Sequence, residues 1–102
     1  MIKIKIKRSE DIIKEVLITG HANYADYGKD IVFSAVSTMA ITTVNAILSL
    51  EETIDASEKS GLLVIRTLKD TEVNQKLLSN MKRMLEELKS QYPKNIEIRN
   101  ED

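Results

Sequence analysis

The feature that most limits how this chain can fold is the stretch from Ile31 to Leu50, which contains no charged residue. Charged residues make up 30% of the whole chain of 102 residues, so the stretch differs sharply from its surroundings. As a helix it is long enough to cross a bilayer. It also carries too many hydroxyl and amide side chains for a good membrane span, namely Ser34, Ser37, Thr38, Thr42, Thr43, Asn45 and Ser49. We therefore expect a helix buried within a soluble protein, and no membrane partner.

The residues on either side of this helix show strand patterns. Isoleucine alternates with lysine over residues 2–7, which is typical of a half-buried strand. Residues 12–19 are rich in Ile, Val and Leu, and a turn at residues 9–11 predicts that they pair with the first strand as a hairpin. A clear strand pattern follows at residues 62–67, which we expect to be central in the sheet, and a shorter one at residues 96–99.

Two further segments are assigned with the same rules. Residues 53–56 carry a weak strand signal, followed by a turn at 57–61, and residues 100–102 are expected to fray. A second helix begins after Asp70 or Thr71 and ends before Pro93, which prevents continuation. Its apolar residues recur at helical spacing and are Val73, Leu77, Leu78, Met81, Met84, Leu85, Leu88 and Tyr92.

The resulting order is strand, strand, helix, a weakly signalled strand, strand, helix, strand. This order predicts an α+β fold, a two-layer sandwich in which a mixed or antiparallel sheet carries both helices on one face. A chain of this length is expected to form a single domain over residues 1–102. The uncharged helix would pack on the sheet with one side, and its other side would face the second helix or a second subunit.

Charge and cysteine content exclude several function classes. The formal net charge is −1, so the chain lacks the basic surface that direct nucleic-acid binding requires. The densest basic set, Lys3, Lys5, Lys7 and Arg8, is interpreted as the solvated face of an edge strand. There is no cysteine, which excludes disulfides, thiolate metal sites and a cysteine nucleophile, and is consistent with a cytoplasmic protein.

A polar segment at residues 20–29 separates the second strand from the uncharged helix, and it holds the only histidine. His21 could act as a general base, or it could be an ordinary surface histidine. Asp26 and Asp30 could orient the imidazole, although Asp30 is equally suited to cap the helix. With one histidine and no nucleotide-binding glycine pattern, neither a metal nor a cofactor is expected.

Other residues of this region have two interpretations each. Ser34 and Ser37, in the first turns of the helix, could act at an oxyanion or as a nucleophile, or simply allow close packing. Tyr24 and Tyr27 could hold an extended peptide or pack onto the domain. Gly20 and Gly28 bracket the loop and could act as hinges or only end the neighbouring elements.

Residues 20–37 as a whole resemble the signature of the ribosomal-processing cysteine protease family, usually called Prp. The family pattern is approximately G-H-A, a short piece with an aromatic residue, G-x-D-I-V-C, then small residues and a serine. The positions that fit are Gly20, His21, Ala22, Tyr27, Gly28, Asp30, Ile31, Val32, Ala35 and Ser37. Residues 44–47 also resemble the family's helix, and the order of elements matches over nearly the whole chain.

The resemblance implies a small α+β sandwich that forms a homodimer. It also implies a cytoplasmic enzyme that removes a short N-terminal extension from large-subunit ribosomal protein twenty-seven with a cysteine–histidine pair. His21 matches the family's histidine and Asp30 its aspartate near the nucleophile. The loop that admits the peptide would include Gly20, Ala22, Tyr24, Tyr27 and Gly28.

The departure from the family is Phe33, which stands where the family has its cysteine. Ser34 does not simply replace the thiol, because one step along a helix turns a side chain by about 100° and raises it by about 1.5 Å. We therefore expect a degenerate active site that retains binding of the ribosomal peptide or a role in ribosome assembly. A divergent hydrolase using Ser34 with His21, and a dimeric interaction module unrelated to ribosomes, are the alternatives, so whether the chain is an enzyme stays open.

Overall fold

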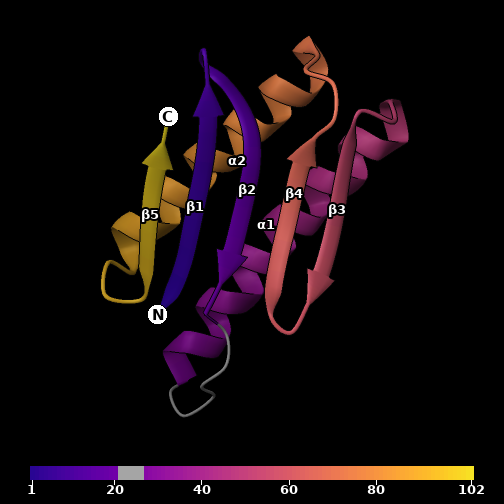
Figure 1. Cartoon of the computed structure of the whole chain (residues 1–102). Coiled ribbons are helices and arrows are strands. Elements are labelled where there is room, and N and C mark those ends of the chain that lie inside the picture. Colours follow the sequence, from indigo (N-terminus) through magenta and orange to yellow (C-terminus); the bar gives the residue numbers. More distant parts are fainter. Residues whose placement is uncertain (21–26) are drawn as a thin grey trace.

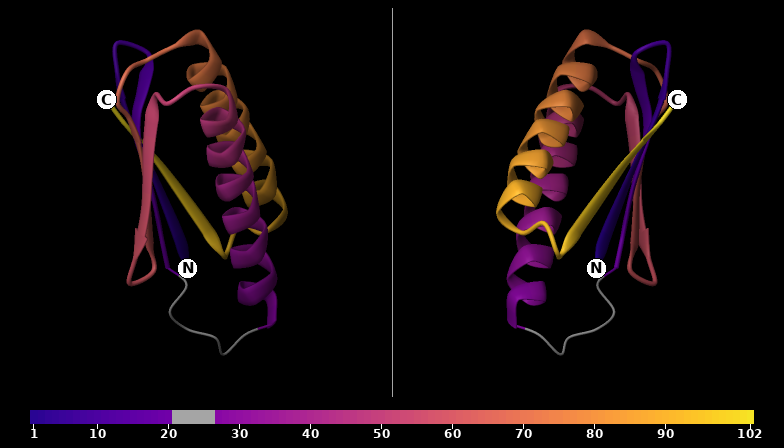
Figure 2. Two further views of the ribbon diagram at one scale, coloured as in Figure 1. Left: turned by 90° about the vertical axis from the view of Figure 1, so that its right-hand side faces the viewer. Right: turned by 90° about the vertical axis from the view of Figure 1, so that its left-hand side faces the viewer.

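The computed structural model describes residues 1–20 and 27–102, with side chains of the first helix described from Ile31 onward. Five strands form one sheet in the order β3-β4-β2-β1-β5, and both helices lie on the same face of it (Figures 1 and 2). The elements are β1 (Ile2–Ser9), β2 (Ile12–Thr19), α1 (Tyr27–Leu50), β3 (Ile54–Lys59), β4 (Leu62–Thr67), α2 (Glu72–Gln91) and β5 (Ile96–Glu101). Only the β1–β5 pairing is parallel, so the predicted α+β two-layer sandwich with a mixed sheet is confirmed.

The strand positions correct four predictions. The lysine-rich β1 is an interior strand between β2 and β5, not an edge strand, and the centre of the sheet is β2 rather than residues 62–67. β3 continues to Lys59 and β5 to Glu101, beyond the predicted ends. Both extensions are polar because β3 and β5 are the two edge strands, where few side chains need to be apolar.

Two tight hairpins connect the antiparallel strands. The linking residues Glu10 and Asp11 have φ of 53° and 64°, and Ser60 and Gly61 have φ of 50° and 79°. Two consecutive positive φ values define the turn whose twist matches that of paired strands. These two-residue turns therefore place β2 directly beside β1 and β4 directly beside β3.

The core lies between the sheet and the helices. The isoleucines of β1 point into it, and α1 contributes one buried stripe. That stripe is Val32, Val36, Ala40, Val44 and Ile47. α1 is thus a core helix on one side, although its length and composition alone would suit a bilayer. Its opposite side remains exposed.

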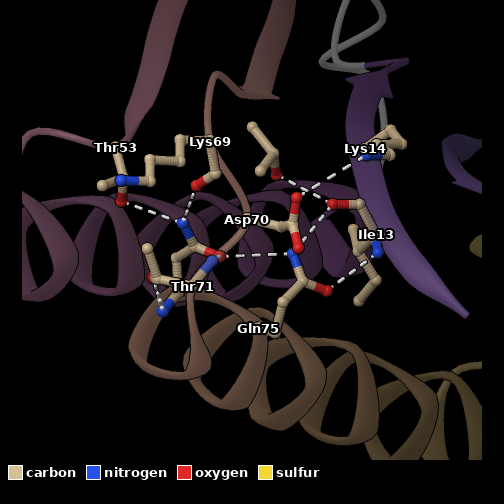
Figure 3. Close-up of polar contacts among 9 residues, drawn as sticks. Ile13, Lys14, Thr53, Lys69, Asp70, Thr71 and Gln75 are labelled. Atoms are coloured by element: carbon tan, nitrogen blue, oxygen red, sulfur yellow. Dashed lines mark hydrogen bonds and ion pairs between the residues drawn. The ribbon is translucent and has the colours of Figure 1, made fainter.

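The start of α2 is fixed by hydrogen bonds centred on Asn74, the one buried polar residue of the described chain (Figure 3). Thr71 caps the helix and forms a reciprocal capping box with Asn74. The Asn74 amide also donates to the Thr53 hydroxyl and to the Lys69 carbonyl, each at 2.8 Å. Next to it, the Gln75 side chain both accepts from and donates to the backbone of Ile13 in β2. Side chains of α2 therefore hold β2 and the start of β3 in place.

A carboxylate completes this polar network at the end of α1. Glu51 accepts hydrogen bonds from the hydroxyls of Thr53 and Thr71. The pKa of Glu51 is lowered below its ordinary value of 4.5, mainly by the hydrogen bond from Thr53 and next by that from Thr71. The end of α1, the start of β3 and the start of α2 therefore meet at one ionised side chain.

Candidate functional site

α1 begins at Tyr27, which is earlier than the sequence predicted. Asp30 is therefore inside the first turn of the helix and is not its cap, and Tyr27 and Gly28 belong to the helix rather than to a loop. An acidic residue in the first turn interacts favourably with the helix dipole, so an aspartate suits the first turn as well as the cap position. The side chains of residues 27–30 lie outside the described part of the structure.

Four candidate residues lie wholly outside what the structure describes. His21, Ala22, Tyr24 and Asp26 lie in the segment 21–26, and the positions predicted for them stay predictions. The segment is bounded on one side by Gly20, the last described residue after β2, and on the other by α1 (grey trace in Figure 1).

Gly20 is at a position where only glycine fits. Its φ is +111°, and a Cβ atom built on it would lie 2.0 Å from the carbonyl oxygen of Met1 and 2.9 Å from Cα of Ile2. No side chain tolerates such an approach to backbone. The chain therefore leaves β2 in close contact with the start of β1, immediately before His21 in the sequence.

Phe33 faces inward from α1 toward the end of the β3–β4 hairpin. Its side chain is half-buried and packs against the hydrophobic core. With Ser37 one turn later, it lines a space of only about 10 Å³. The other lining residues come from α1, β2, β3, β4 and the hairpin turn, and are Ile18, Ile41, Glu58, Gly61 and Leu63. A space of that size is at the limit for a single water molecule, so the space that these described residues line does not admit a peptide group.

A more open groove continues from this closed space along α1. It has a volume of about 170 Å³ and shares Ile41, Glu58 and Leu63 with the space beside Phe33. Val44 of α1 and Ala56 and Ser57 of β3 complete its lining. Because Ala56 is small, α1 and the edge strand leave room there for an apolar group.

The two serines of the helix are separated by the structure. Ser37 lines the closed space with Phe33, whereas Ser34 is exposed and is not part of that lining. Ser34 follows Phe33 directly, so its side chain is turned by about 100° from that of Phe33 around the helix. The contribution of β3 and β4 was not found from the sequence, because those positions join the site only through sheet pairing.

The described residues limit the chemistry of this site. Among residues 1–20 and 27–102, no group of three or more His, Asp or Glu side chains is placed to hold a metal ion. The groove offers apolar surface with one carboxylate, Glu58, at its end. Such a surface can bind an apolar segment of a peptide.

Comparison with protein families and with curated proteins gives one consistent result. A family model described as "Cysteine protease Prp" matches residues 1–97. The ribosomal processing cysteine protease Prp of Bacillus subtilis (strain 168) is 33% identical over 109 residues, covering 96% of each chain. The protein of the same name from Staphylococcus aureus (strain NCTC 8325 / PS 47) is 29% identical over 93 residues, covering 87% of this chain and 88% of its own.

Solved structures agree with the sequence comparisons. The crystal structure of the essential ribosomal processing protease Prp from S. aureus, in complex with a covalently linked product peptide, superposes with a TM-score of 0.88. The same protease in complex with a substrate peptide gives a TM-score of 0.87. In both cases the identity is 28%, and the match covers 99% of this chain and 100% of the other.

Proposed function

Because this chain belongs to the cysteine protease Prp family, we propose that it is a family member with a degenerate active site that binds peptide without cleaving it. The peptide is the N-terminal extension of large-subunit ribosomal protein twenty-seven, and the role is in ribosome assembly. The observation that carries the proposal is Phe33: the chain has no cysteine, and this side chain lines a space of only about 10 Å³ beside α1. The S. aureus relative binds substrate and product peptides on the same fold, which supports peptide binding.

The groove beyond Phe33 is the surface on which the peptide would lie. Its apolar lining between α1 and β3 is open, whereas the space at Phe33 is filled. The proposal therefore predicts measurable affinity for the peptide and no turnover. Ser34 is exposed and turned away from the space at Phe33, so we assign it no catalytic role.

Three variants test this proposal with one labelled peptide that spans the N-terminal extension. Binding is measured by fluorescence anisotropy, and cleavage by mass spectrometry. The unaltered chain should bind and not cleave. Phe33→Ala should bind more tightly, because it opens the closed space without adding a nucleophile. Phe33→Cys should cleave, and adding His21→Ala to Phe33→Cys should abolish that cleavage.

Other outcomes would contradict particular parts of the proposal. Cleavage by the unaltered chain that is lost in Ser34→Ala would establish the divergent hydrolase instead. Absence of binding by the unaltered chain and by both Phe33 variants at micromolar concentration would refute peptide binding. In that case the chain would be an interaction module unrelated to this ribosomal protein.

The exposed side of α1 supports a second part of the proposal, a homodimer. Residues 31–50 of α1 contain no charged residue, and several of their large apolar side chains are widely exposed: Ile31 at 62%, Ile41 at 47%, Leu48 at 43% and Leu50 at 68%. Exposed apolar side chains on an uncharged helical stretch, in a chain with 30% charged residues, are typical of an interaction surface. We propose that two copies meet through it, and that the dimer works in the cytoplasm.

Light scattering on the purified chain tests the dimer. Leu48→Glu places a charge in this face without touching the groove and should give a monomer. Leu68→Glu is the matched control, because Leu68 is 67% exposed but lies outside α1, and it should leave the dimer intact. A monomeric unaltered chain, or a dimer that survives Leu48→Glu, would refute this use of α1.

A further inference from the structure

The face of the sheet opposite the helices is not covered by any element of the described residues (Figure 2). Strand register arranges its side chains in rows across the sheet. One row alternates in sign from edge to edge and contains Asp55, Arg66, Glu15, Lys7 and Glu101. Within it, Nε of Arg66 lies 2.8 Å and Nζ of Lys7 3.4 Å from the Glu15 carboxylate. The charges of this row therefore compensate one another.

The neighbouring row has a different character. It contains Ser57, Val64, Leu17, Lys5 and Arg99, so two cations stand directly opposite each other on β1 and β5. Like charges at paired positions destabilise a sheet. Their carboxylate contacts are long, 3.8 Å from Lys5 to Glu101 and 3.6 Å from Arg99 to Glu97, and involve exposed side chains. Such contacts offset little of the repulsion.

A hollow of about 370 Å³ lies over this second row, at the end of the sheet near the start of β1. Its lining is Lys3, Ile4, Lys5, Leu17, Thr19, Leu62, Glu97 and Arg99. The apolar floor, Leu17 and Leu62, adjoins Val64, which is only 9% exposed although no layer covers it. Three cations and one carboxylate surround this floor. The volume and the combination of an apolar floor with few charged groups are those of a small-molecule site.

We propose that this hollow binds a free anionic amphiphile, a small molecule with an apolar body and one carboxylate, sulfate or phosphate. The body lies on Leu17 and Leu62, and the anionic group lies between the side chains of Lys3, Lys5 and Arg99. The anion relieves the repulsion between Lys5 and Arg99, whose carboxylate contacts within the protein are long and exposed. The site is on the opposite face from Phe33, so it does not depend on the function proposed above.

Decanoate, used below its micellar concentration, is the probe. A ¹H–¹⁵N NMR titration of the full chain should give saturable shifts at the amides of Leu17, Thr19 and Leu62. Decanol, which has the same tail without charge, and acetate, which has the charge without the tail, should both bind more weakly. Lys5→Gln and Arg99→Gln should each weaken decanoate binding about twofold to fivefold. Lys7→Gln is the matched control on the same strand, in the compensated row, and should leave the affinity unchanged.

Four results would overturn the proposal. Shifts centred on α1 or α2 would place the amphiphile elsewhere. Equal binding of decanol would show that the anionic group is not recognised. Equal losses of decanoate affinity in Lys7→Gln and Lys5→Gln would show that the two rows of side chains do not differ in anion binding. Binding to anionic phospholipid vesicles without any saturable binding of decanoate would replace the free ligand by a membrane surface.

Discussion

Replacing Asn74 by alanine tests whether the polar network at the start of α2 stabilises the fold as strongly as its geometry indicates. Asn74 is fully buried, and its side chain takes part in four hydrogen bonds. It donates to Thr53 and Lys69 at 2.8 Å, and it accepts from the Thr71 backbone and the Gln75 side chain at 3.2 Å. Alanine fits the helix but removes all four.

The loss of its hydrogen bond to Asn74 does not cost the same free energy for each of the four partners. The Thr53 hydroxyl still donates to Glu51, and the Gln75 amide still donates to Ile13, so these two losses cost about 0.5 kcal/mol each. The Lys69 carbonyl and the Thr71 N–H lose a partner inside the fold, at about 1 kcal/mol or more each. The sum is about 3 kcal/mol. That is a large share of the 5 to 15 kcal/mol by which domains are usually stable, so the variant should still fold.

Urea unfolding followed by circular dichroism measures this loss. The midpoint should fall with an unchanged dependence on urea concentration, since the surface exposed on unfolding is the same. The melting temperature should fall by about 12 to 24 °C, at 4 to 8 °C per kcal/mol for a domain of this size. Asn80→Ala, on the exposed side of the same helix, is the control and should change stability by less than about 0.5 kcal/mol.

Two results would refute this reasoning. A loss below about 1 kcal/mol for Asn74→Ala would mean that water replaces the lost partners, so that the network contributes little. Equal losses for Asn74→Ala and Asn80→Ala would mean that the effect is one of helix propensity rather than of buried hydrogen bonds.

Three further predictions follow from single contacts. Gly20→Ala should lower the free energy of unfolding by about 2 kcal/mol or more in urea unfolding, because a Cβ meets the Met1 carbonyl at a positive φ. Phe33→Ala should cost about 1 to 3 kcal/mol by the same measurement, less than a fully buried phenylalanine, because Phe33 is half-buried. The Arg66 hydrogen bond, with Lys7 also contributing, lowers the pKa of Glu15 below its ordinary 4.5. The ionised Glu15 side chain therefore stabilises the fold above about pH 4.5, and this stabilisation is lost as the pH falls through the lowered pKa of Glu15 in the folded protein. Glu15→Gln should flatten that acid decline in melting temperature; an unchanged decline would show that other carboxylates cause it.

The fold could be predicted because its strongest signals are local. Alternating isoleucines identified β1, and the apolar spacing of α2 with Pro93 behind it fixed that helix. The prediction was wrong where pairing rather than local pattern decides. β1 has the lysines of an edge strand but is interior, because β5 returns to pair with it in parallel. Nothing in residues 96–101 indicates that partner.

The site was predictable in part for the same reason. The signature around residues 20–37 marked the end of β2, and the close approach of Gly20 to Met1 gives a structural reason for the first glycine of that signature. The start of the helix was misplaced because Asp30 suits a cap and a first turn equally well. Glu58 and Leu63 are added to the site by the β3–β4 hairpin, which no motif in the sequence marks.

Phe33 differs from a cysteine in two properties, which Phe33→Cys changes together and Phe33→Ala does not. Compared with a cysteine at this position, it removes a thiol and also fills the space beside Ser37 and Leu63. A Phe33→Cys variant changes both properties at once, so cleavage by that variant alone would not show which of them the family's reaction requires at this position. Phe33→Ala opens the space alone. If it binds peptide as tightly as Phe33→Cys, the framework of α1, β3 and β4 is sufficient for recognition, and the thiol adds only chemistry. If only the cysteine variant binds, the thiol itself contributes to recognition, and the groove at Ala56 is not the principal peptide surface.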